Sequence, residues 1–389
     1  MADVATQFQA SSLPKRLIIT AALLAAYRIG LAIPVPGSET LSLFSGGVTP
    51  YLLAAVLISL LRPQISSLNS FFEGGAAGRE RLDYITRYAT ALFAILLAIN
   101  WSAPITLASA HATLTVAAGS MLLLFLAEEI TESGIGSGVI WFILVDIIRA
   151  FPGVFSQLFS LLNDHKIGMM VALLPIIAIF VILAVVVAIE TAQRKITVLY
   201  SARVVGRQMM GGQKTAIPIK VNSAGILGAV AVLPLFWFFP AGNITTVVLV
   251  PLLIGFFSWY YCGAASDPKE MANTIQNSGG YIPGVRTGDG IVNHFRDIRD
   301  KIALGGAVGF ALIALVWEAI RVGIGLPGPL AAPFLIIIAG ATMDLLNQGQ
   351  GRMMLEKGDG QMMRAAAKAR EGSQGKRRGT QRKKKKRKR

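Results

Sequence analysis

A long apolar stretch of the sequence runs over residues 168–189 and reads GMMVALLPIIAIFVILAVVVAI. Its 22 residues contain no charged side chain. An α-helix needs roughly 20 apolar residues to cross the hydrocarbon core of a bilayer. The stretch therefore predicts a membrane-spanning helix.

Nine further apolar stretches of comparable character lie on either side of it. They cover residues 17–33, 48–62, 84–103, 110–128, 138–160, 223–239, 244–262, 302–320 and 328–346. The composition agrees, because 53% of the 389 residues are hydrophobic and only 15% are charged, against about 25% charged in an ordinary soluble domain. We expect an all-α, polytopic membrane protein with ten transmembrane helices.

The basic residues of the connecting segments predict the orientation. Ten spans place both termini on one side of the membrane, and 17 Lys and Arg residues fall in the connections on that side. The opposite side receives three, which are Arg149, Lys166 and Arg321. Because positive residues accumulate on the cytoplasmic side, both termini are predicted to be cytoplasmic. So are two long loops at 190–221 and 263–301.

The net charge of +16 is concentrated at the C-terminal end. Residues 1–346 carry +3, whereas residues 347–389 carry +13, with 11 basic side chains between Lys376 and Arg389. A run of this kind buries no core and is expected to be disordered on its own. It could be a solvated run without a partner, bind anionic lipid, or bind ribosomal RNA, and we favour the last reading.

The sequence offers little for catalysis or metal binding. It has one cysteine, Cys262, and three scattered histidines, and it lacks a phosphate-binding loop, a nucleophile elbow and a His-Glu-x-x-His motif. The glycine-rich run Gly134–Gly138 joins two apolar stretches, so a flexible turn explains it better than a nucleotide site. We expect no enzyme activity, no cofactor and no metal.

Ionisable residues within membrane spans are candidate functional groups. Asp146 with Arg149, and Glu318 with Arg321, have i,i+3 spacing, for which local ion pairing is a sufficient explanation. Carboxylates at the cytoplasmic span ends are expected to be solvated at the interface: Glu128, Glu129, Glu190 and Asp344. Charges near the midplane are scarce, which argues against an ion-coupled transporter.

Seven sequence segments occur in the order, and at the places between spans, that a known family shows. They are Tyr27–Gly30 with Ile33–Gly37, Pro50-Tyr51, Ala77–Arg79 with Tyr84–Tyr88, Ala127–Gly138, Glu190–Ile196, Pro218–Gly225 and Ser278–Arg286. In this ordered set, spread over roughly residues 13–350, the chain resembles SecY, the central channel subunit of the bacterial protein translocon.

The resemblance implies a fold and a function. Two pseudo-symmetric five-helix halves, 17–163 and 164–346, would follow a cytoplasmic segment at 1–16 and precede the basic tail at 347–389. Unfolded polypeptide would pass through a pore between the halves, and hydrophobic segments would leave sideways into lipid. The implied partners are SecE-like and SecG-like small subunits, the SecA ATPase or the ribosome, and the nascent chain, in a bacterial-type inner membrane.

The resemblance also assigns candidate site residues. The pore ring corresponds to six apolar side chains: Val48, Leu52, Val139, Ile143, Val230 and Ile337. Such a ring excludes water and ions yet yields to a threading chain. Asn222 falls at the lateral gate, with a helix-start cap as the alternative. The residues implied to bind a motor protein or the ribosome are Arg286 and four basic residues of the first loop: Arg194, Lys195, Arg203 and Arg207.

Two departures from the family pattern leave alternatives open. Between Pro36-Gly37 and Pro50 only SETLSLFSGGVT remains, which is too short for the helix that plugs the outer funnel in relatives. At the gate, Leu53 and Leu97 stand where more polar residues are expected. A degenerate paralogue acting as a membrane-protein insertase is therefore one alternative, and a small-molecule secondary transporter is another.

Overall fold

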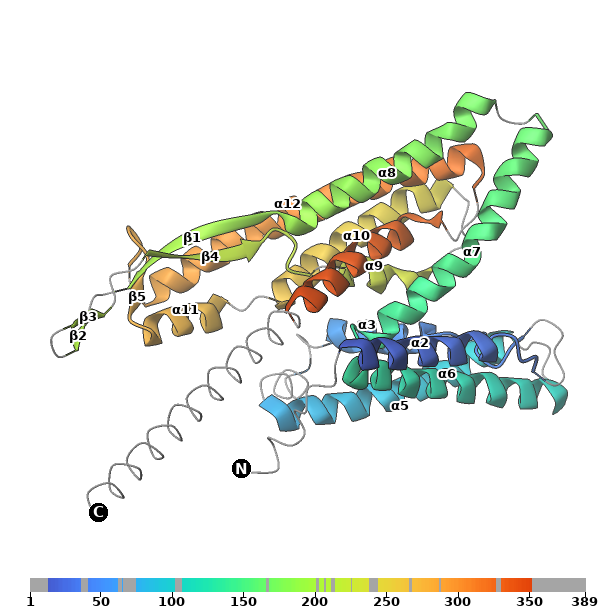
Figure 1. Ribbon diagram of the computed structural model, residues 1–389, viewed down its shortest axis with the longest axis horizontal. Coiled ribbons are helices and arrows are strands. Elements are labelled where there is room, and N and C mark those ends of the chain that lie inside the picture. The colour runs from blue at the N-terminus through green and yellow to red at the C-terminus, as the bar shows by residue number, and fades with distance from the viewer. Residues whose placement is uncertain are drawn as a thin grey trace, which may run out of the picture.

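The computed structural model describes fourteen segments of the chain. These are residues 13–35, 41–61, 65, 75–101, 107–165, 168–200, 203–205, 208–210, 214–224, 226–237, 244–265, 268–286, 288–326 and 330–351. The predictions for residues 1–12, for Arg207 and for most of the basic tail lie outside them. Within the described part, helices dominate and form two groups joined by one long helix (Figure 1).

The first group contains four helices. They are α2 (Leu13–Gly30), α3 (Thr49–Leu61), α5 (Gly75–Trp101) and α6 (Leu107–Ser133). Helix α5 packs against both α3 and α6, and α2 packs against α6. The long helix α7 (Gly138–Asn163) contacts α2 and α6 at one end and α8 at the other. It therefore carries the chain from the first group to the second (Figure 1).

The second group contains the remaining spans. They are α8 (Met169–Thr191), α9 (Leu227–Val232) with the 3₁₀ helix η1 (Leu233–Trp237), α10 (Ile244–Ala265), α12 (Asp289–Ile324) and a final helix over 332–351. Helix α10 packs against α9 and α12, and α12 packs against α8. Helix α3 contacts α9 and η1, so the two groups also meet directly there.

Each of the ten predicted spans coincides with helix in the described residues, but not all are long. Six helices have the length and composition to cross a membrane: α5, α6, α7, α8, α10 and α12. Helix α3 has 13 residues, and α2 includes Lys15, Arg16 and Arg28. The stretch at 223–239 is not one α-helix, because the path tightens to a 3₁₀ helix around Pro234, which has no N–H for an i→i−4 bond.

The two loops expected at 190–221 and 263–301 fold together into one structured unit. Strand β1 (Gln193–Tyr200) pairs antiparallel with β4 (Lys214–Lys220) and with β5 (Gly280–Tyr281), giving the order β4-β1-β5. Two short strands, β2 (Arg203–Val205) and β3 (Gln208–Met210), continue the hairpin. We call β1–β5, helix α11 (Pro268–Asn277) and the first turns of α12 the hairpin unit.

Alternation along β1 explains why this unit folds. Ile196 and Val198 are buried, whereas Lys195 and Thr197 are exposed, so one face of the strand is apolar. That face packs against apolar residues of α11 and α12: Ala272, Ile275, Ile291, Phe295 and Ile298. Figure 1 shows the unit projecting beyond the helices, along the line of α8 and α12.

The short segment before α3 folds as turns. Pro34 and Ser42 form an isolated antiparallel bridge, and residues 43–48 are turns that lead directly into α3. The Phe44 side chain is 4% exposed, and its ring centroid lies 5.8 Å from that of Tyr27. No helix occurs between residues 41 and 48, while residues 36–40 lie outside the described part. The absence of a plug helix thus stays a prediction.

Candidate pore constriction and docking surface

The six predicted ring residues come from four separate elements. Val48 and Leu52 stand at the start of α3, Val139 and Ile143 at the start of α7, Val230 on α9, and Ile337 on the final helix. All six belong to one large hydrophobic cluster, which extends over both helix groups. Val48, Leu52, Ile143 and Ile337 are buried, and Val139 and Val230 are half-buried against them. Both helix groups therefore contribute to this cluster.

Two glycines permit the close helix approaches that position these side chains. A Cβ added at Gly138 would overlap the backbone of Ala127, so the start of α7 lies directly against α6. A Cβ added at Gly340 would overlap the Ile226 side chain, so the final helix lies close to the start of α9. A larger residue at Gly138 would have to displace the α6 backbone, and one at Gly340 would have to displace the Ile226 side chain.

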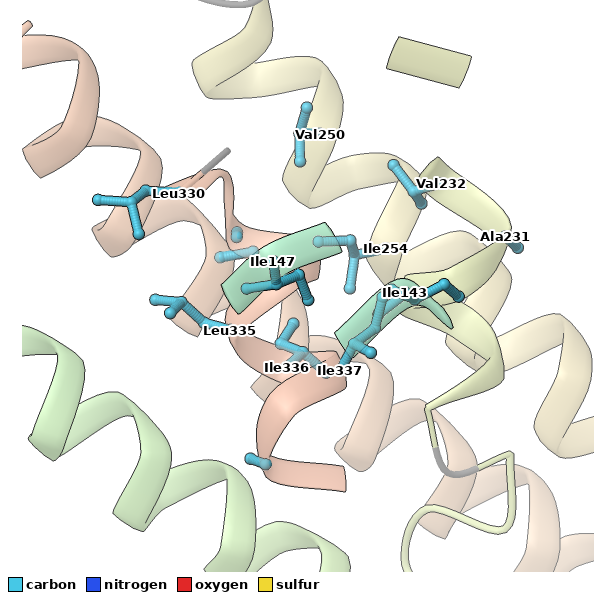
Figure 2. Close-up of a cluster of buried hydrophobic side chains, with 14 of the residues drawn as sticks. Ile143, Ile147, Ala231, Val232, Val250, Ile254, Leu330, Leu335, Ile336 and Ile337 are labelled. Atoms are coloured by element: carbon cyan, nitrogen blue, oxygen red, sulfur yellow. The ribbon is translucent and has the colours of Figure 1, made fainter. Parts of the chain in front are cut away.

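Sequence reasoning missed some members of the cluster. Figure 2 shows Ile147 of α7 and Ile254 of α10 in the same group of side chains as Ile143, Ile336 and Ile337. Ile147 and Ile254 are 3% and 0% exposed. Ile147 follows Ile143 by one helical turn, and that i+4 spacing could have identified it. No comparable signal marks Ile254, because α10 is apolar on all sides.

The cluster is aliphatic where the two groups meet, which defines what it can do. Side chains of this kind hold no ordered water and attract no ion, so a closed contact between them resists ion flow. Their attraction is non-directional. They can therefore separate around a passing chain without offering it a specific binding site.

Asn222 is buried but does not cap a helix. It is 3% exposed, and α9 begins only at Leu227 with Ile226 as its N-cap, so the alternative role as a helix-start cap is wrong. Its side-chain Nδ2 donates a hydrogen bond to Oε1 of Glu190, at 2.8 Å. That bond ties Asn222 to the end of α8, within the second group. Its role at a lateral gate stays a prediction.

The predicted docking residues share the hairpin unit. Arg194 and Lys195 are exposed on β1, and Arg286 is exposed in the segment after β5. Because Leu199 of β1 pairs with Tyr281 of β5, the two predicted docking segments form one continuous sheet. Arg203 lies on β2, but its side chain is outside the described part. Arg207 is outside it entirely.

The two predicted i,i+3 ion pairs have different outcomes. Arg321 and Glu318 pair at 2.6 Å, and both side chains are fully buried. The other prediction is wrong: in the described part of the chain Asp146 makes no ion pair with Arg149, and its Oδ1 accepts a hydrogen bond from the Tyr27 hydroxyl at 2.7 Å. The buried hydroxyl of Tyr27 is the nearer partner, since Arg149 lies on the exposed side of α7.

Two carboxylates expected to be merely solvated have specific partners. Glu128 of α6 accepts two hydrogen bonds from the Arg87 guanidinium of α5, at 3.0 and 2.7 Å. Glu190 accepts the bond from Asn222 described above. Among the described residues no group of three or more His, Cys, Asp or Glu side chains is placed to hold a metal ion.

The fold defines a class of protein: an all-α, multi-pass membrane protein built from two groups of helices. The family model for SecY matches residues 42–346, and the chain belongs to the SecY family. The protein translocase subunit SecY of Thermotoga maritima is 29% identical, over 91% of this chain and 96% of its own length.

Solved structures give the same fold. One is a SecY protein whose plug domain is described as stabilising the closed state of the translocation channel and maintaining a membrane seal. It matches with a TM-score of 0.67 and 15% identity, over 89% of this chain and 94% of that one. Sec61 in the canine ribosome–channel complex matches with a TM-score of 0.58 and 14% identity, over 89% and 94%. The predicted polytopic fold is therefore confirmed.

Proposed function

We propose that this chain is the central subunit of a protein-conducting channel. The channel translocates unfolded polypeptides across a membrane and releases hydrophobic segments sideways into the lipid. One observation carries the proposal: six ring residues, expected from four separate spans, all belong to the apolar core that runs through both helix groups. The family and the relatives named as translocase subunits agree with it.

The two helix groups act as the halves of the channel. We take 17–163 and 164–346 as pseudo-symmetric halves that separate at the cluster when a chain passes. The closed state is the one in which Ile143 and Ile337 are buried among their neighbours. Val48, Leu52, Val139 and Val230 complete the ring from the other elements, and Asn222 acts near the gate through its bond to Glu190.

The hairpin unit is the docking surface for the partner that supplies the energy. Its exposed basic residues are Arg194 and Lys195 on β1 and Arg286 in the segment after β5, and this positive charge suits the negative surface of a ribosome. The Sec61 match is a channel in complex with a ribosome. A SecA-type ATPase is the second candidate partner, and SecE-like and SecG-like subunits complete the assembly in a bacterial-type inner membrane, with both termini cytoplasmic.

Genetic complementation tests the function directly. The intact chain should restore growth and protein export to cells depleted of their own SecY. Restored insertion of membrane proteins without restored export would instead favour the insertase alternative, which the short segment before α3 makes worth testing. If neither is restored although the protein accumulates in the membrane, the channel proposal fails.

The basic tail is proposed to tether ribosomes. It supplies 11 Lys and Arg residues between Lys376 and Arg389, and binding by counterion release weakens steeply with salt. The intact protein should co-sediment with ribosomes in neutral detergent at low salt, and a chain ending at Gly375 should lose most of this binding. Equal binding by both chains would reject the tether and leave anionic lipid as the partner to test.

A further inference from the structure

The two helix groups are joined covalently on one side only. The chain passes from α7 to α8, so that side of the bundle is held together by the backbone. On the other side, α3 meets α9, η1 and the end of α10 without a covalent connection. A lateral opening between the groups must therefore form at this second contact, which we call the seam.

A hydrogen bond between α10 and α3 crosses the seam. The hydroxyl of Tyr260, near the end of α10, donates to the backbone carbonyl of Ser59, near the end of α3. Both residues are half-buried. Tyr260 is also held in place by the stacked ring of Phe256, with centroids 6.2 Å apart and an interplanar angle of 20°. The hydroxyl is thus presented to α3 by a packed aromatic side chain.

The sequence explains why the Ser59 carbonyl is available. In a helix this carbonyl would accept a bond from the N–H four residues later, but residue 63 is proline and has no N–H. The Leu61 carbonyl, in contrast, does accept a bond from the N–H of Ile65, at 3.0 Å. The Ser59 carbonyl therefore has no donor at the usual i+4 position, and it accepts the hydrogen bond of Tyr260 from the other helix group.

We propose that the bond from Tyr260 to Ser59 is a latch on lateral opening, resting on the channel function proposed above. Opening the seam breaks the bond, so the Ser59 carbonyl must exchange the Tyr260 hydroxyl for water. The latch therefore adds to the cost of opening, and it sets how hydrophobic a client segment must be to leave through the seam. Tyr260 is a positioning residue here, since it acts through the equilibrium between closed and open seam.

Removal of the hydroxyl tests the latch. In Tyr260→Phe the Ser59 carbonyl is unsatisfied in the closed seam and free to be hydrated in the open one, so opening becomes easier. One hydrogen bond of ordinary net strength corresponds to about a fivefold change in an equilibrium. For clients with a graded series of Leu and Ala in a test segment, membrane integration should need fewer Leu residues. Tyr88→Phe is the matched control, because Tyr88 is 76% exposed on α5.

A second variant distinguishes a latch from a loss of packing. Pro63→Ala restores an N–H four residues after Ser59, which gives the carbonyl a donor within its own helix. In that background Tyr260→Phe should have little further effect on the integration threshold. If Tyr260→Phe keeps its full effect on the integration threshold in the Pro63→Ala background, the hydroxyl acts in some other way. The latch would then be rejected.

The seam can also be measured without any client, so that failure of the latch and failure of the channel function are separable. Spin labels at Leu57→Cys and Trp259→Cys, both exposed positions on α3 and α10, report the distance across the seam in lipid nanodiscs. Tyr260→Phe should shift the distribution toward longer distances. An unchanged distribution overturns the latch, whatever the complementation result, and a shifted distribution without complementation retains the latch while removing the channel function.

Discussion

Replacement of Ile337 by asparagine tests whether the apolar cluster seals a pore. Ile337 is fully buried in the cluster, beside Ile143 and Ile336 (Figure 2). The asparagine amide finds no polar partner among these aliphatic side chains in the closed state, whereas water can reach it once the ring opens. The substitution therefore acts on the equilibrium between the two states as well as on folding.

The size of the effect follows from two contributions. A buried amide without a hydrogen bond costs roughly 1–3 kcal/mol, and the isoleucine side chain forfeits part of the roughly 1.5–3 kcal/mol gained by full burial. We expect a net shift of about 2 kcal/mol toward the open state. Since 1.4 kcal/mol is a factor of ten, the open fraction should rise by about thirtyfold.

The measurement is ion conductance of the purified protein in planar bilayers, without motor or client. Ile337→Asn should raise the leak strongly, and Val230→Asn, from the half-buried position, should raise it less. Leu346→Asn is the matched control, since that residue lies on the same helix and is 54% exposed. If Ile337→Asn lowers thermal stability but leaves conductance at the wild-type level, Ile337 is an ordinary core residue and the pore lies elsewhere.

Three further substitutions have defined outcomes. Phe44→Ala removes a buried ring from the turn before α3, which should destabilise that turn by about 3–5 kcal/mol and increase bilayer leak; Phe155→Ala, at a position 49% exposed, should not. Arg321→Met leaves the buried Glu318 carboxylate without its partner, so thermal denaturation in detergent should show a loss of about 3–5 kcal/mol; an unchanged melting temperature would contradict this. Arg286→Glu should leave the stability unchanged, because the residue is exposed, but weaken ribosome co-sedimentation; normal binding would exclude it from the docking surface.

Hydropathy predicted where the helices lie but not how each is built. The spans at 168–189 and 302–320 coincide with α8 and α12, because a long apolar run in lipid must satisfy its backbone hydrogen bonds internally, which a helix does. The stretch at 223–239 looks equally apolar, yet it divides into α9 and η1 around Pro234. Hydropathy averages over a window and does not register the missing N–H of a single proline.

The loops show what local sequence can and cannot supply. The alternation of Ile196 and Val198 with exposed neighbours is a strand signal that could be found within 190–221. The third strand could not, because Gly280 and Tyr281 are two residues with no pattern of their own, and they pair with β1 from 80 positions away. Only the tertiary packing of α11 and α12 beneath the sheet brings them there.

For the proposed site, the sequence supplied a set of candidate positions rather than an arrangement. The resemblance pointed to Ile143 and Ile337, and both lie in the cluster. It did not indicate the bond from Asn222 to Glu190, nor the one from Tyr260 to Ser59, because these depend on side chains that no motif connects. The hydrogen bonds between spans are the part of the site that required the structure.

The side predicted to face away from the cytoplasm is closed by specific contacts rather than by long loops. Before α3, Phe44 packs into a place that only Gly30 leaves open, since a Cβ there would overlap its ring. After α12, Glu318 binds Arg321 and accepts the N–H of Ala332 at 2.7 Å, which fixes the start of the final helix five residues before Ile337.

Each of these two contacts ends on an element that carries ring residues: the first on the turn that leads into Val48, the second on the helix of Ile337. A family member with short loops on this side can keep its proposed ring closed in this way. A buried aromatic ring and a buried ion pair fix the positions of the elements that they join over short distances. The closure of the proposed ring then depends on the stability of these two contacts. Loosening either should raise the leak even though neither belongs to the ring.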